Sequence, residues 1–455
     1  MHKVTFLLAA CLSLVATGVQ AQGFGIYEQG ACTMARAGAA VAEPCQDGSA
    51  IYINPAGAAG SRGLIVGVGG TLIAGTGWFR ADGGRTTDLD SPLAGVPHGY
   101  VLYGVTNRLA LGAGVYVPYG LGVRWPLDFA GRFVGYDSRL DTTYIQPTVA
   151  YAVSDRVSLG GGITIGIGSV KLKRREDLAT VPLGIVPGLT FGALVNSQTD
   201  FATTELSASR ATGAGFNLGA LVKAHDRVQI GARYLSQMTL SYEGTATFAA
   251  VPGSVRVTKS NPLGLPVGAP LDAFVAQVVG SLPQQRVSTS IDMPAQFSAG
   301  VSVHASPRVT LYDDYQWVGW SSFKTIVIHF SNPIPADEEL VQNYHDTSAL
   351  RTGVVVEVRP AIRLSAGYFH NQAAAPDETV TPLLPEAARN HVTAGVTWTV
   401  RPKVSLDMAY QFVRHADRRG RIMNPPPGVL PTTALNSGLY HERANLLGIT
   451  LTYRR

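Results

Sequence analysis

The residues of this chain that could do chemistry together are few, and the clearest pair is Cys32 and Cys45. They are the two of the three cysteines that would remain after removal of an N-terminal leader carrying Cys11. Thiols close in sequence tend to be oxidised in a compartment outside the cytoplasm. We therefore predict a Cys32–Cys45 disulfide, which would stabilise the short loop that it closes by roughly 3 kcal/mol. The alternative is a pair of buried free thiols.

No catalytic or cofactor motif accompanies these cysteines. The chain has no nucleophile elbow, HExxH pair, Walker loop or calcium loop, and Ser, His and Asp do not cluster. The glycine-rich stretch Gly67-Val68-Gly69-Gly70 lies in an expected strand that no helix follows, so it is not a dinucleotide fingerprint. We therefore predict no enzyme activity, no metal site and no cofactor, and an enzyme is kept only as a minor alternative.

The chain begins with a pattern typical of a secretory signal peptide. Lys3 precedes an apolar run from Val4 to Val19, and Val19 and Ala21 occupy the two positions that a signal peptidase reads. We predict that residues 1–21 are the signal peptide. Leu8-Ala9-Ala10-Cys11 also resembles a lipoprotein cleavage box, but the apolar run before Cys11 is very short and continues past it.

The composition indicates a secreted all-β protein or a transmembrane barrel. Hydrophobic residues make up 46% of the chain and charged residues 15%, which is low for a soluble domain. Yet no apolar run after the leader approaches the ~20 residues of a membrane helix. The net charge of +5 is small and the basic residues are scattered, so we predict no nucleic-acid partner.

Beyond residue 60 the chain alternates apolar and polar residues in many segments, which is the pattern of a β-strand with two different faces. The clearest runs are 157–167, 392–400 and 404–412. In the first run, Val, Leu and Ile share one face, whereas the opposite face carries Ser, Thr and Gly. Such a polar face fits a water-filled lumen as well as it fits bulk water.

Connection lengths distinguish a soluble sandwich from a barrel, because short turns alternate with long connections along the chain. The six short turns fall at Thr106–Arg108, Ser154–Arg156, Lys223–Arg227, Ala305–Arg308, Arg359–Pro360 and Arg401–Lys403. The seven long loops fall near 80–97, 118–139, 171–211, 243–293, 321–347, 371–389 and 415–441. This asymmetry is typical of outer-membrane barrels. We predict an all-β fold, a 14-stranded antiparallel transmembrane β-barrel over residues 61–455 with long extracellular loops.

Residues 22–60 are expected to form a hatch inside the lumen of this barrel. The segment is rich in Gly and Ala and lacks the alternation of the strands. A barrel of this width is not filled by its own side chains, so an inserted plug can occupy it. Asn54 can cap a short helix that begins at Pro55, because proline is tolerated at the first helical position. The alternative for Asn54-Pro55-Ala56 is a cap without functional meaning.

With these features in place, the sequence resembles the FadL/TodX (OmpP1) family of outer-membrane transporters for long-chain fatty acids and other hydrophobic compounds. The pieces that carry the resemblance are Gly23-Phe24, Asn54-Pro55-Ala56, Pro118-Tyr119-Gly120-Leu121, Met293-Pro294, Trp320-Ser321-Ser322-Phe323 and Leu384-Pro385 to Arg389. Their order and spacing match along the whole mature chain. The resemblance implies a plugged, monomeric barrel in the outer membrane of a Gram-negative type of cell. Its implied partners are a hydrophobic small molecule and outer-membrane lipid.

The resemblance also implies a route for passive diffusion of the ligand. A kink at Pro118-Tyr119-Gly120 would open the wall sideways into the membrane, and the gate residues Asn54, Pro55 and Ala56 of the hatch would face this kink. Proline interrupts a strand ladder and glycine permits a bulge, so these residue types suit a kink. The implied ligand-binding residues are Phe24, Val117, Arg174 and His345.

The ligand itself is left open between a fatty acid and an aromatic or aliphatic hydrocarbon. Fatty-acid members hold the carboxylate with an arginine, a serine and a lysine, at positions that here look like Arg174, Val117 and His345. Only Arg174 is a permanent cation, because the charge of a histidine depends on pH. The reduced set of donors favours a less polar ligand. Otherwise, Arg174 is one surface charge among several and His345 is a solvated loop residue.

Two long loops indicate a hydrophobic ligand independently of the resemblance. The loop 171–211 is rich in Leu, Val, Ile and Phe, and the loop 243–293 carries apolar residues at helical spacing after Pro270. An exposed apolar patch often marks a binding surface. The alternative is that two helices bury these faces against each other, with or without a groove between them. A general porin for small polar solutes, the rival function, would need neither a hatch nor apolar outer loops.

Overall fold

The computed structural model describes residues 23–455 except 83, 185, 252 and 422–437. The predicted signal peptide and the lipoprotein box lie outside the described residues. Within the described part of the chain, no helix has both the length and the apolar character needed to cross a membrane.

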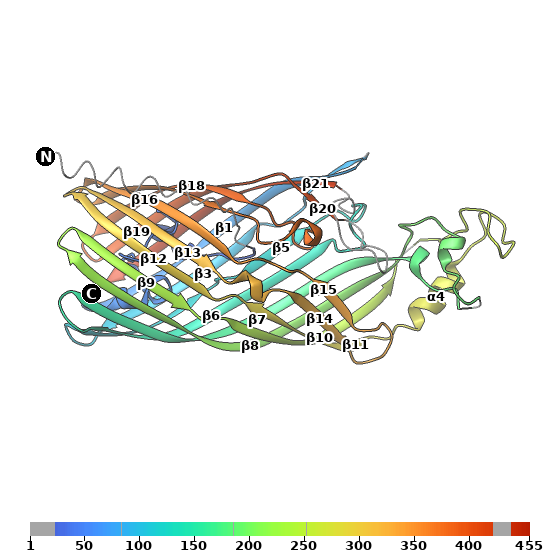
Figure 1. Cartoon of the computed structure of the whole chain (residues 1–455), viewed down its shortest axis with the longest axis horizontal. Coiled ribbons are helices and arrows are strands. Elements are labelled where there is room, and N and C mark those ends of the chain that lie inside the picture. Colours follow the sequence, from blue (N-terminus) through green and yellow to red (C-terminus); the bar gives the residue numbers. More distant parts are fainter. Residues whose placement is uncertain (1–22, 83, 185, 252, 422–437) are drawn as a thin grey trace.

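The wall of the molecule is one antiparallel sheet that closes on itself, because β1 pairs with β3 on one side and with β21 on the other (Figure 1). The wall strands are β1 (Gly63–Ala81), β3 (Ala94–Gly104), β4 (Leu109–Tyr116), β5 (Gly120–Arg124), β6 (Asp137–Ala152), β7 (Val157–Asp177), β8 (Asp200–His225), β9 (Val228–Leu235), β10 (Met238–Ala250), β11 (Gln285–Met293), β12 (Gln296–Ser306), β13 (Val309–Val318), β16 (Thr347–Arg359), β17 (Ile362–Asn371), β18 (Arg389–Arg401), β19 (Val404–His415) and β21 (Gly438–Arg454).

Three of these wall strands are interrupted: β4 continues as β5, β9 as β10, and β11 as β12. The outer loops add four short strands, β2 (Thr86–Asp88), β14 (Thr325–Phe330), β15 (Glu338–Val341) and β20 (Arg418–Gly420). Counting each interrupted strand once gives the predicted closed barrel of 14 antiparallel strands.

The six predicted short turns are confirmed, since each separates two paired wall strands by a few residues at the end of the barrel where β21 finishes (Figure 1). Two of the predicted long loops are too long. β7 continues to Asp177 and β8 begins at Asp200, while β10 continues to Ala250 and β11 begins at Gln285. Beyond the membrane a strand can expose polar residues to water on both faces, so these strands continue although they no longer alternate apolar and polar residues.

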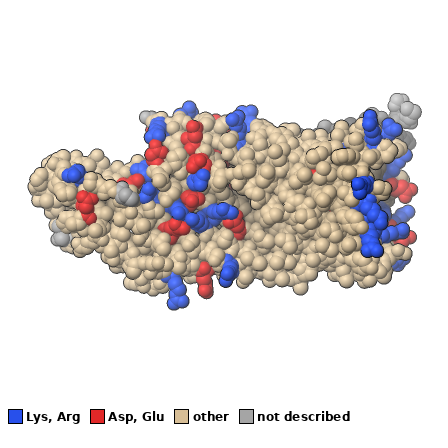
Figure 2. All heavy atoms as spheres, turned by 180° about the vertical axis from the view of Figure 1, so that it is seen from behind, with Lys and Arg blue, Asp and Glu red and all other residues tan. Residues whose placement is uncertain are grey.

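The predicted apolar faces point outward. Leu159, Ile163, Ile165 and Ile167 of β7 are exposed, as are Leu447, Ile449 and Leu451 of β21. Figure 2 shows charged side chains gathered towards the two ends of the barrel, with a broad band between them that is almost free of charge. In a membrane protein such a band faces the lipid chains.

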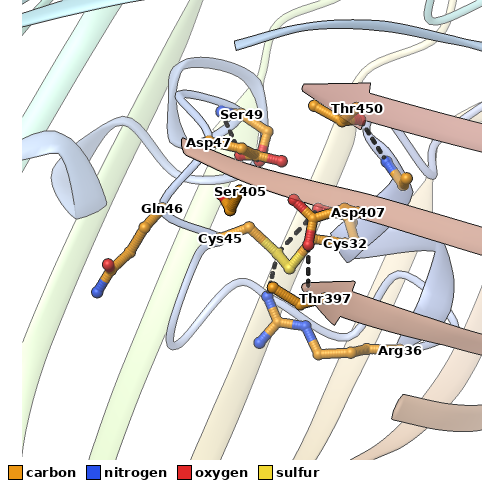
Figure 3. Close-up of a disulfide and its surroundings, with 12 residues drawn as sticks. Cys32, Arg36, Cys45, Gln46, Asp47, Ser49, Thr397, Ser405, Asp407 and Thr450 are labelled. Carbon is orange, nitrogen blue, oxygen red and sulfur yellow. Dashed lines mark hydrogen bonds between the residues drawn. A yellow bond between two sulfur atoms is a disulfide. The ribbon is translucent and has the colours of Figure 1, made fainter. Parts of the chain in front are cut away.

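The N-terminal segment, residues 23–60, contacts strands on opposite sides of the barrel. It forms three short helices, α2 (Ala31–Ala35), α3 (Ala50–Ile53) and η1 (Pro55–Ala58). Helix α2 packs against β18, β19 and β21, whereas η1 packs against β6, β7 and β8. Cys32 and Cys45 are joined by a disulfide, which Figure 3 shows beside Thr397, Asp407 and Thr450 of the wall.

Buried polar side chains of the wall fasten this segment. Asp314 accepts hydrogen bonds from the backbone N–H groups of Ala40 and Val41, at 2.7 and 2.8 Å. Arg351 forms a buried ion pair with Glu28, with Nη1 2.5 Å from Oε1. Because an unpaired buried charge costs several kcal/mol, these paired contacts specify one position for the segment.

The two apolar outer loops pack together into a lobe beyond the barrel, at the right of Figure 1. It contains α4 (Asp272–Gly280), the helix that the spacing after Pro270 predicts. The other loop has only two 3-10 turns among its described residues, η2 (Leu178–Thr180) and η3 (Phe191–Ala193), because Pro182 and Pro187 interrupt it. Leu178, Phe191 and Leu271 are buried together in the lobe. Loop-to-loop packing therefore hides much of the apolar surface.

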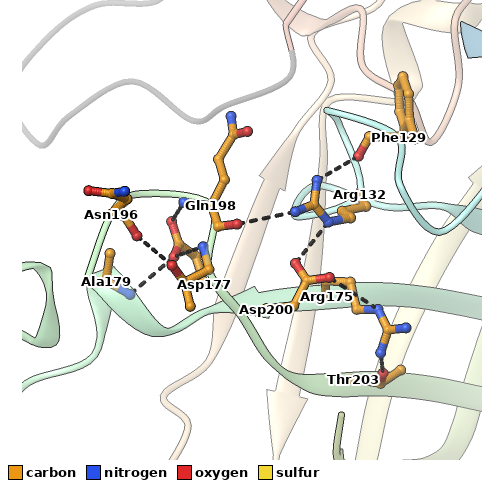
Figure 4. Close-up of polar contacts among 10 residues, drawn as sticks. Phe129, Arg132, Arg175, Asp177, Ala179, Asn196, Gln198, Asp200 and Thr203 are labelled. Atoms are coloured by element: carbon orange, nitrogen blue, oxygen red, sulfur yellow. Dashed lines mark hydrogen bonds and ion pairs between the residues drawn. The ribbon is translucent and has the colours of Figure 1, made fainter. Parts of the chain in front are cut away.

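Polar contacts hold the lobe to the barrel (Figure 4). Arg132, in the connection between β5 and β6, donates to Asp200 Oδ1 at 2.8 Å and to the carbonyl oxygen of Gln198 at 3.1 Å. The carboxylate of Asp177 accepts from the backbone N–H groups of Gln198 at 2.7 Å and Ala179 at 3.0 Å. These bonds satisfy loop backbone groups that would otherwise lack partners.

The remaining helical turns of the described residues lie in outer loops. They are η4 (Trp320–Ser322), which follows β13, and η5 (Asp377–Thr379), which lies between β17 and β18.

Candidate ligand-binding site

An apolar pocket of about 130 Å³ lies inside the outer half of the barrel. Its apolar lining comes from six wall strands, two outer loops and the N-terminal segment: Phe24, Leu121, Leu140, Val170, Leu172, Leu206, Ala208, Tyr242, Val287, Ile291, Phe323, Ile326, Ile328, Leu340, Leu383 and Leu384. Most of these wall residues alternate with exposed neighbours along their strands, so the same period that produces the lipid face also directs them inward.

Phe24 forms the floor of this pocket with other aromatic side chains. Its ring meets Trp320, Phe323 and Tyr119 edge to face, with ring centroids 4.8, 5.3 and 6.1 Å away. Edge-to-face contacts of this kind stabilise a packed arrangement beyond the area that they bury. Trp320 lies in η4 and Phe323 directly follows it, so one of the segments that carry the family resemblance contributes to the site.

The rim of the pocket is polar and carries two cations that already have acidic partners. Arg139 Nε lies 2.7 Å from Asp141 Oδ2, and Lys171 Nζ lies 3.2 Å from Glu205 Oε1. The remaining polar lining consists of neutral side chains: Ser138, Ser207, Ser288, Thr289, Gln342 and Thr381. An anionic ligand would therefore compete with Asp141 or Glu205 for a charged partner, whereas a neutral ligand would not.

The wall next to the pocket is interrupted where the kink is predicted. The β3–β4 ladder runs up to the pair Gly99–Val115, and β5 then pairs with β6 alone. At the break, Ile26 N donates to the carbonyl oxygen of Pro118 at 2.8 Å, and Gly120 N donates to that of Phe24 at 3.0 Å. The N-terminal segment thus takes the hydrogen bonds that the neighbouring strand does not.

A second cavity, of about 450 Å³, lies between this break and the interior. Part of its lining comes from the edges of the break, with Val96 and Pro97 of β3 and Leu121 and Val123 of β5. It shares five lining residues with the apolar pocket, namely Phe24, Leu121, Arg139, Leu140 and Leu384. Phe24 therefore stands between the apolar pocket and the gap in the wall.

The structure brings together some of the residues expected at the site. Phe24 lines both cavities, and Val117 and Gly120 line the one at the break. Arg174 lines neither cavity, because β7 extends through it and its guanidinium pairs with Glu176 at 2.9 Å and Glu338 at 2.6 Å. His345 is an exposed residue of an outer loop and lines neither cavity.

The expected position of Asn54-Pro55-Ala56 is wrong in one respect. Asn54 caps η1 as predicted, with its Oδ1 accepting from Ala56 N at 3.2 Å. However, its Nδ2 donates to the carbonyl oxygen of Ala220 in β8 at 3.1 Å, and η1 packs on β6, β7 and β8. Residues 24–26 meet the kink instead. The turn η1 lies elsewhere, because it packs closely against Gly160 of β7 and Gly219 of β8, which have no side chain to exclude it.

The polar groups behind Phe24 were missed by the sequence analysis. Arg389 Nη2 donates to the carbonyl oxygen of Gly23 at 2.5 Å, and the side chain of Glu386 is completely buried beside Arg389 and Arg418. Burial raises the pKa of Glu386, against the opposing effect of these arginines and of backbone N–H donors such as that of Ala375. Glu386 and Arg389 are recognisable in the sequence as charged residues beside a strand, but no local pattern predicts that Arg389 contacts residue 23.

No group of three or more His, Cys, Asp or Glu side chains within the described residues is arranged to hold a metal ion. The site is therefore made of apolar surface, hydroxyl groups and paired charges.

The whole chain matches known outer-membrane proteins. Residues 12–454 match the family described as outer membrane protein transport protein (OMPP1/FadL/TodX). The chain is 24% identical to the 47 kDa outer membrane protein of Pasteurella multocida, over 98% of this chain and 97% of that protein. It is 20% identical to the long-chain fatty acid transport protein of Escherichia coli, over 89% of this chain and 91% of that protein.

Solved structures share the fold. A FadL homologue of Pseudomonas aeruginosa superposes with a TM-score of 0.78 at 19% identity, covering 95% of this chain and all (100%) of that chain. The toluene transporter TodX of P. putida superposes with a TM-score of 0.69 at 17% identity, covering 96% of this chain and 99% of that chain. The match over nearly the full length shows that this chain belongs to the OMPP1/FadL/TodX family of outer membrane transport proteins.

Proposed function

We propose that this barrel takes up small hydrophobic compounds across the outer membrane, holds them in the apolar pocket and releases them sideways through the gap between β3 and β5. The observation that carries the proposal is that the apolar pocket and the cavity at the break in the wall lie next to each other, on the two sides of Phe24. The E. coli relative named for long-chain fatty acid transport and the solved toluene transporters agree with this class of cargo.

Residues 23–60 serve as the hatch in this proposal. Helices α2 and η1 contact opposite sides of the wall, and most of their side chains are buried. A polar solute that followed the barrel axis would have to displace these contacts. A general porin would instead keep an open aqueous path, so the hatch favours uptake of compounds that leave the lumen sideways.

The cargo that fits best is a neutral hydrocarbon of the size of a single aromatic ring. The pocket holds about 130 Å³, and an engineered apolar cavity of about 150 Å³ is known to bind benzene. Its rim cations are already paired with Asp141 and Glu205. A fatty acid is the second candidate, because Lys171 or Arg139 could exchange its carboxylate partner for that of the ligand.

Sideways release follows from the phase that the cargo prefers. An apolar compound gains free energy when it leaves water for an apolar environment, so the membrane interior is its favoured destination. A gap in the wall delivers it there without a passage through the periplasm. The outer leaflet lipid is the partner at this opening.

A filled pocket tests the proposal. Ala208 lines the pocket on β8, so Ala208→Phe should occupy it and reduce uptake of both labelled toluene and a labelled fatty acid. Ala214→Phe on the exposed face of the same strand is the matched control and should leave uptake unchanged. Equal uptake by the two variants, with equal amounts of folded barrel, would show that the pocket is not on the route.

A further inference from the structure

The wall contains a second gap. It lies between β11 and β14, two strands that also line the apolar pocket. The β12–β13 ladder ends at the pair Gln296–Val318 and at the bond from Gly319 N to the carbonyl oxygen of Ala295, at 2.9 Å. Pairing resumes only between Ser288 and His329. Across residues 289–294 and 320–327, all of which are described, one side-chain bond spans the gap, from Thr289 Oγ1 to the carbonyl oxygen of Val327 at 2.7 Å.

The sequence explains why the two strands part here. Pro294 has no N–H group to donate to a ladder, and its carbonyl oxygen is taken from inside the barrel by the hydroxyl of Tyr119, at 2.8 Å. On the other side of the gap, η4 turns the chain inward and buries Trp320 completely. The two wall segments on either side of the gap are thus held apart because each of them makes contacts with the interior of the barrel.

A cavity of about 450 Å³ fills this gap, and its lining differs from that of the apolar pocket. Eight of its side chains carry hydroxyl groups: Thr239, Ser241, Tyr242, Ser288, Thr289, Ser290, Ser322 and Thr325. Glu243, Asp292 and His329 also line it. Ser241 and Ser290 are exposed on the outer face of the wall, so the cavity opens onto that face.

The hydroxyl-lined cavity adjoins the apolar pocket. Tyr242, Ile291, Phe323 and Ile326 line both of them, as do Ser288 and Thr289. The gap between β3 and β5 adjoins the same pocket through Phe24 and Leu121. The pocket therefore has two lateral openings, one lined mainly by hydroxyl groups and the other edged by apolar residues of β3 and β5.

We propose that the gap between β11 and β14 is an inlet through which a neutral hydrophobic solute reaches the apolar pocket from the outer face of the barrel. This inference rests on the proposed function, since it takes the apolar pocket as the site that receives the solute. A hydroxyl-lined opening stays hydrated, so the solute remains in water until it passes Ile291 and Phe323. It then gains the free energy of leaving water. The gap between β3 and β5 serves as the outlet.

A cysteine introduced at the inlet allows this route to be blocked reversibly by chemical modification. The cysteines at positions 32 and 45 are joined in a disulfide, and the third, Cys11, lies in the predicted signal peptide. In the processed chain Ser290→Cys would therefore supply a single free thiol on the exposed side of the inlet. Modification with a bulky, membrane-impermeant methanethiosulfonate should slow toluene uptake by whole cells several-fold, and reduction of the label should restore it. Asn390→Cys, exposed on β18 and outside the lining of this cavity, is the control and should keep its uptake rate after the same modification.

Ser241→Cys, which lines the same cavity from β10, repeats the test if Ser290→Cys assembles poorly. The inlet is overturned if both modified variants take up toluene at their unmodified rates, or if neither thiol reacts while Asn390→Cys does. Equilibrium binding of toluene to the purified barrel separates this failure from failure of the proposed function. A blocked inlet slows uptake but leaves affinity unchanged, whereas a wrongly assigned pocket would leave both affinity and uptake unchanged in Ala208→Phe.

Discussion

Gly120 donates its backbone N–H to the carbonyl oxygen of Phe24 at 3.0 Å, so the kinked wall strand is completed by the N-terminal segment and not by β3. The same residue, Phe24, separates the apolar pocket from the cavity at the gap. Together with the bond from Ile26 N to the carbonyl oxygen of Pro118, this contact couples the position of the N-terminal segment to the state of the proposed outlet.

The first prediction concerns this contact. A Cβ atom at Gly120 would lie 3.2 Å from Ile26 Cδ1, so Gly120→Val should press against Ile26 and fill the break. Uptake of hydrophobic compounds should fall while the barrel still assembles. Gly99→Val on β3 is the control, because a Cβ there meets nothing within 4 Å and Gly99 lines neither cavity. Normal uptake of every compound tested by Gly120→Val would exclude the β3–β5 outlet.

Two cations should respond differently to the class of ligand. Lys171 lines the pocket and Arg174 does not. If the cargo is a fatty acid, Lys171→Met should weaken its binding by roughly 1.5–3 kcal/mol, as for a lost hydrogen bond to a charged group. Binding of toluene should hardly change. Isothermal titration with both ligands makes the comparison.

Arg174→Ala is predicted to act on stability and not on binding. It would leave Glu176 and Glu338 without their shared partner, at a cost of about 1–3 kcal/mol. Thermal unfolding followed by gel mobility should register this loss, while the affinities for toluene and for a fatty acid stay the same. A selective loss of fatty-acid affinity would return Arg174 to the binding site.

The disulfide should stabilise the hatch and not the wall. Replacing both Cys32 and Cys45 by serine should lower the stability of the N-terminal segment by roughly 3 kcal/mol on the chain-entropy account. Hydrogen exchange should then speed up at residues 31–53, while exchange in β7 and β8 stays slow. Mass mapping of the native protein without reduction provides the direct check, since two alkylatable thiols would contradict the bridge.

Removal of the hatch should open the barrel. Outside the two gaps the wall strands satisfy their backbone hydrogen bonds among themselves, and only the bonds that residues 24 and 26 make at the kink would be lost. A chain lacking residues 23–60 should therefore still assemble. It should admit small polar solutes, as measured by liposome swelling, because the contacts across the lumen would be gone. Unchanged permeability of the truncated barrel would contradict the role of residues 23–60 as a plug.

Sequence alone determined the wall. Strand alternation and turn residues act over a few positions, so the 14 strands, their outward apolar faces and the six short turns could be predicted without a structure. Helix α4 and the cap at Asn54 are equally local and were also predictable. The extension of β7 to Asp177 was not, because its charged outer residues break the alternation that marks a strand. The monomeric state stays a prediction.

Tertiary structure decided how distant segments meet. The pocket draws residues from Phe24 to Leu384, and its position depends on the register of every strand between them, which no local pattern encodes. The pairing of residues 24–26 with the kink, in place of Asn54-Pro55-Ala56, and the pairing of Arg174 with Glu338 depend on the same long-range register. So does the second gap in the wall, since Pro294 marks a break in one strand but only the opposing turn at Trp320 turns that break into an opening.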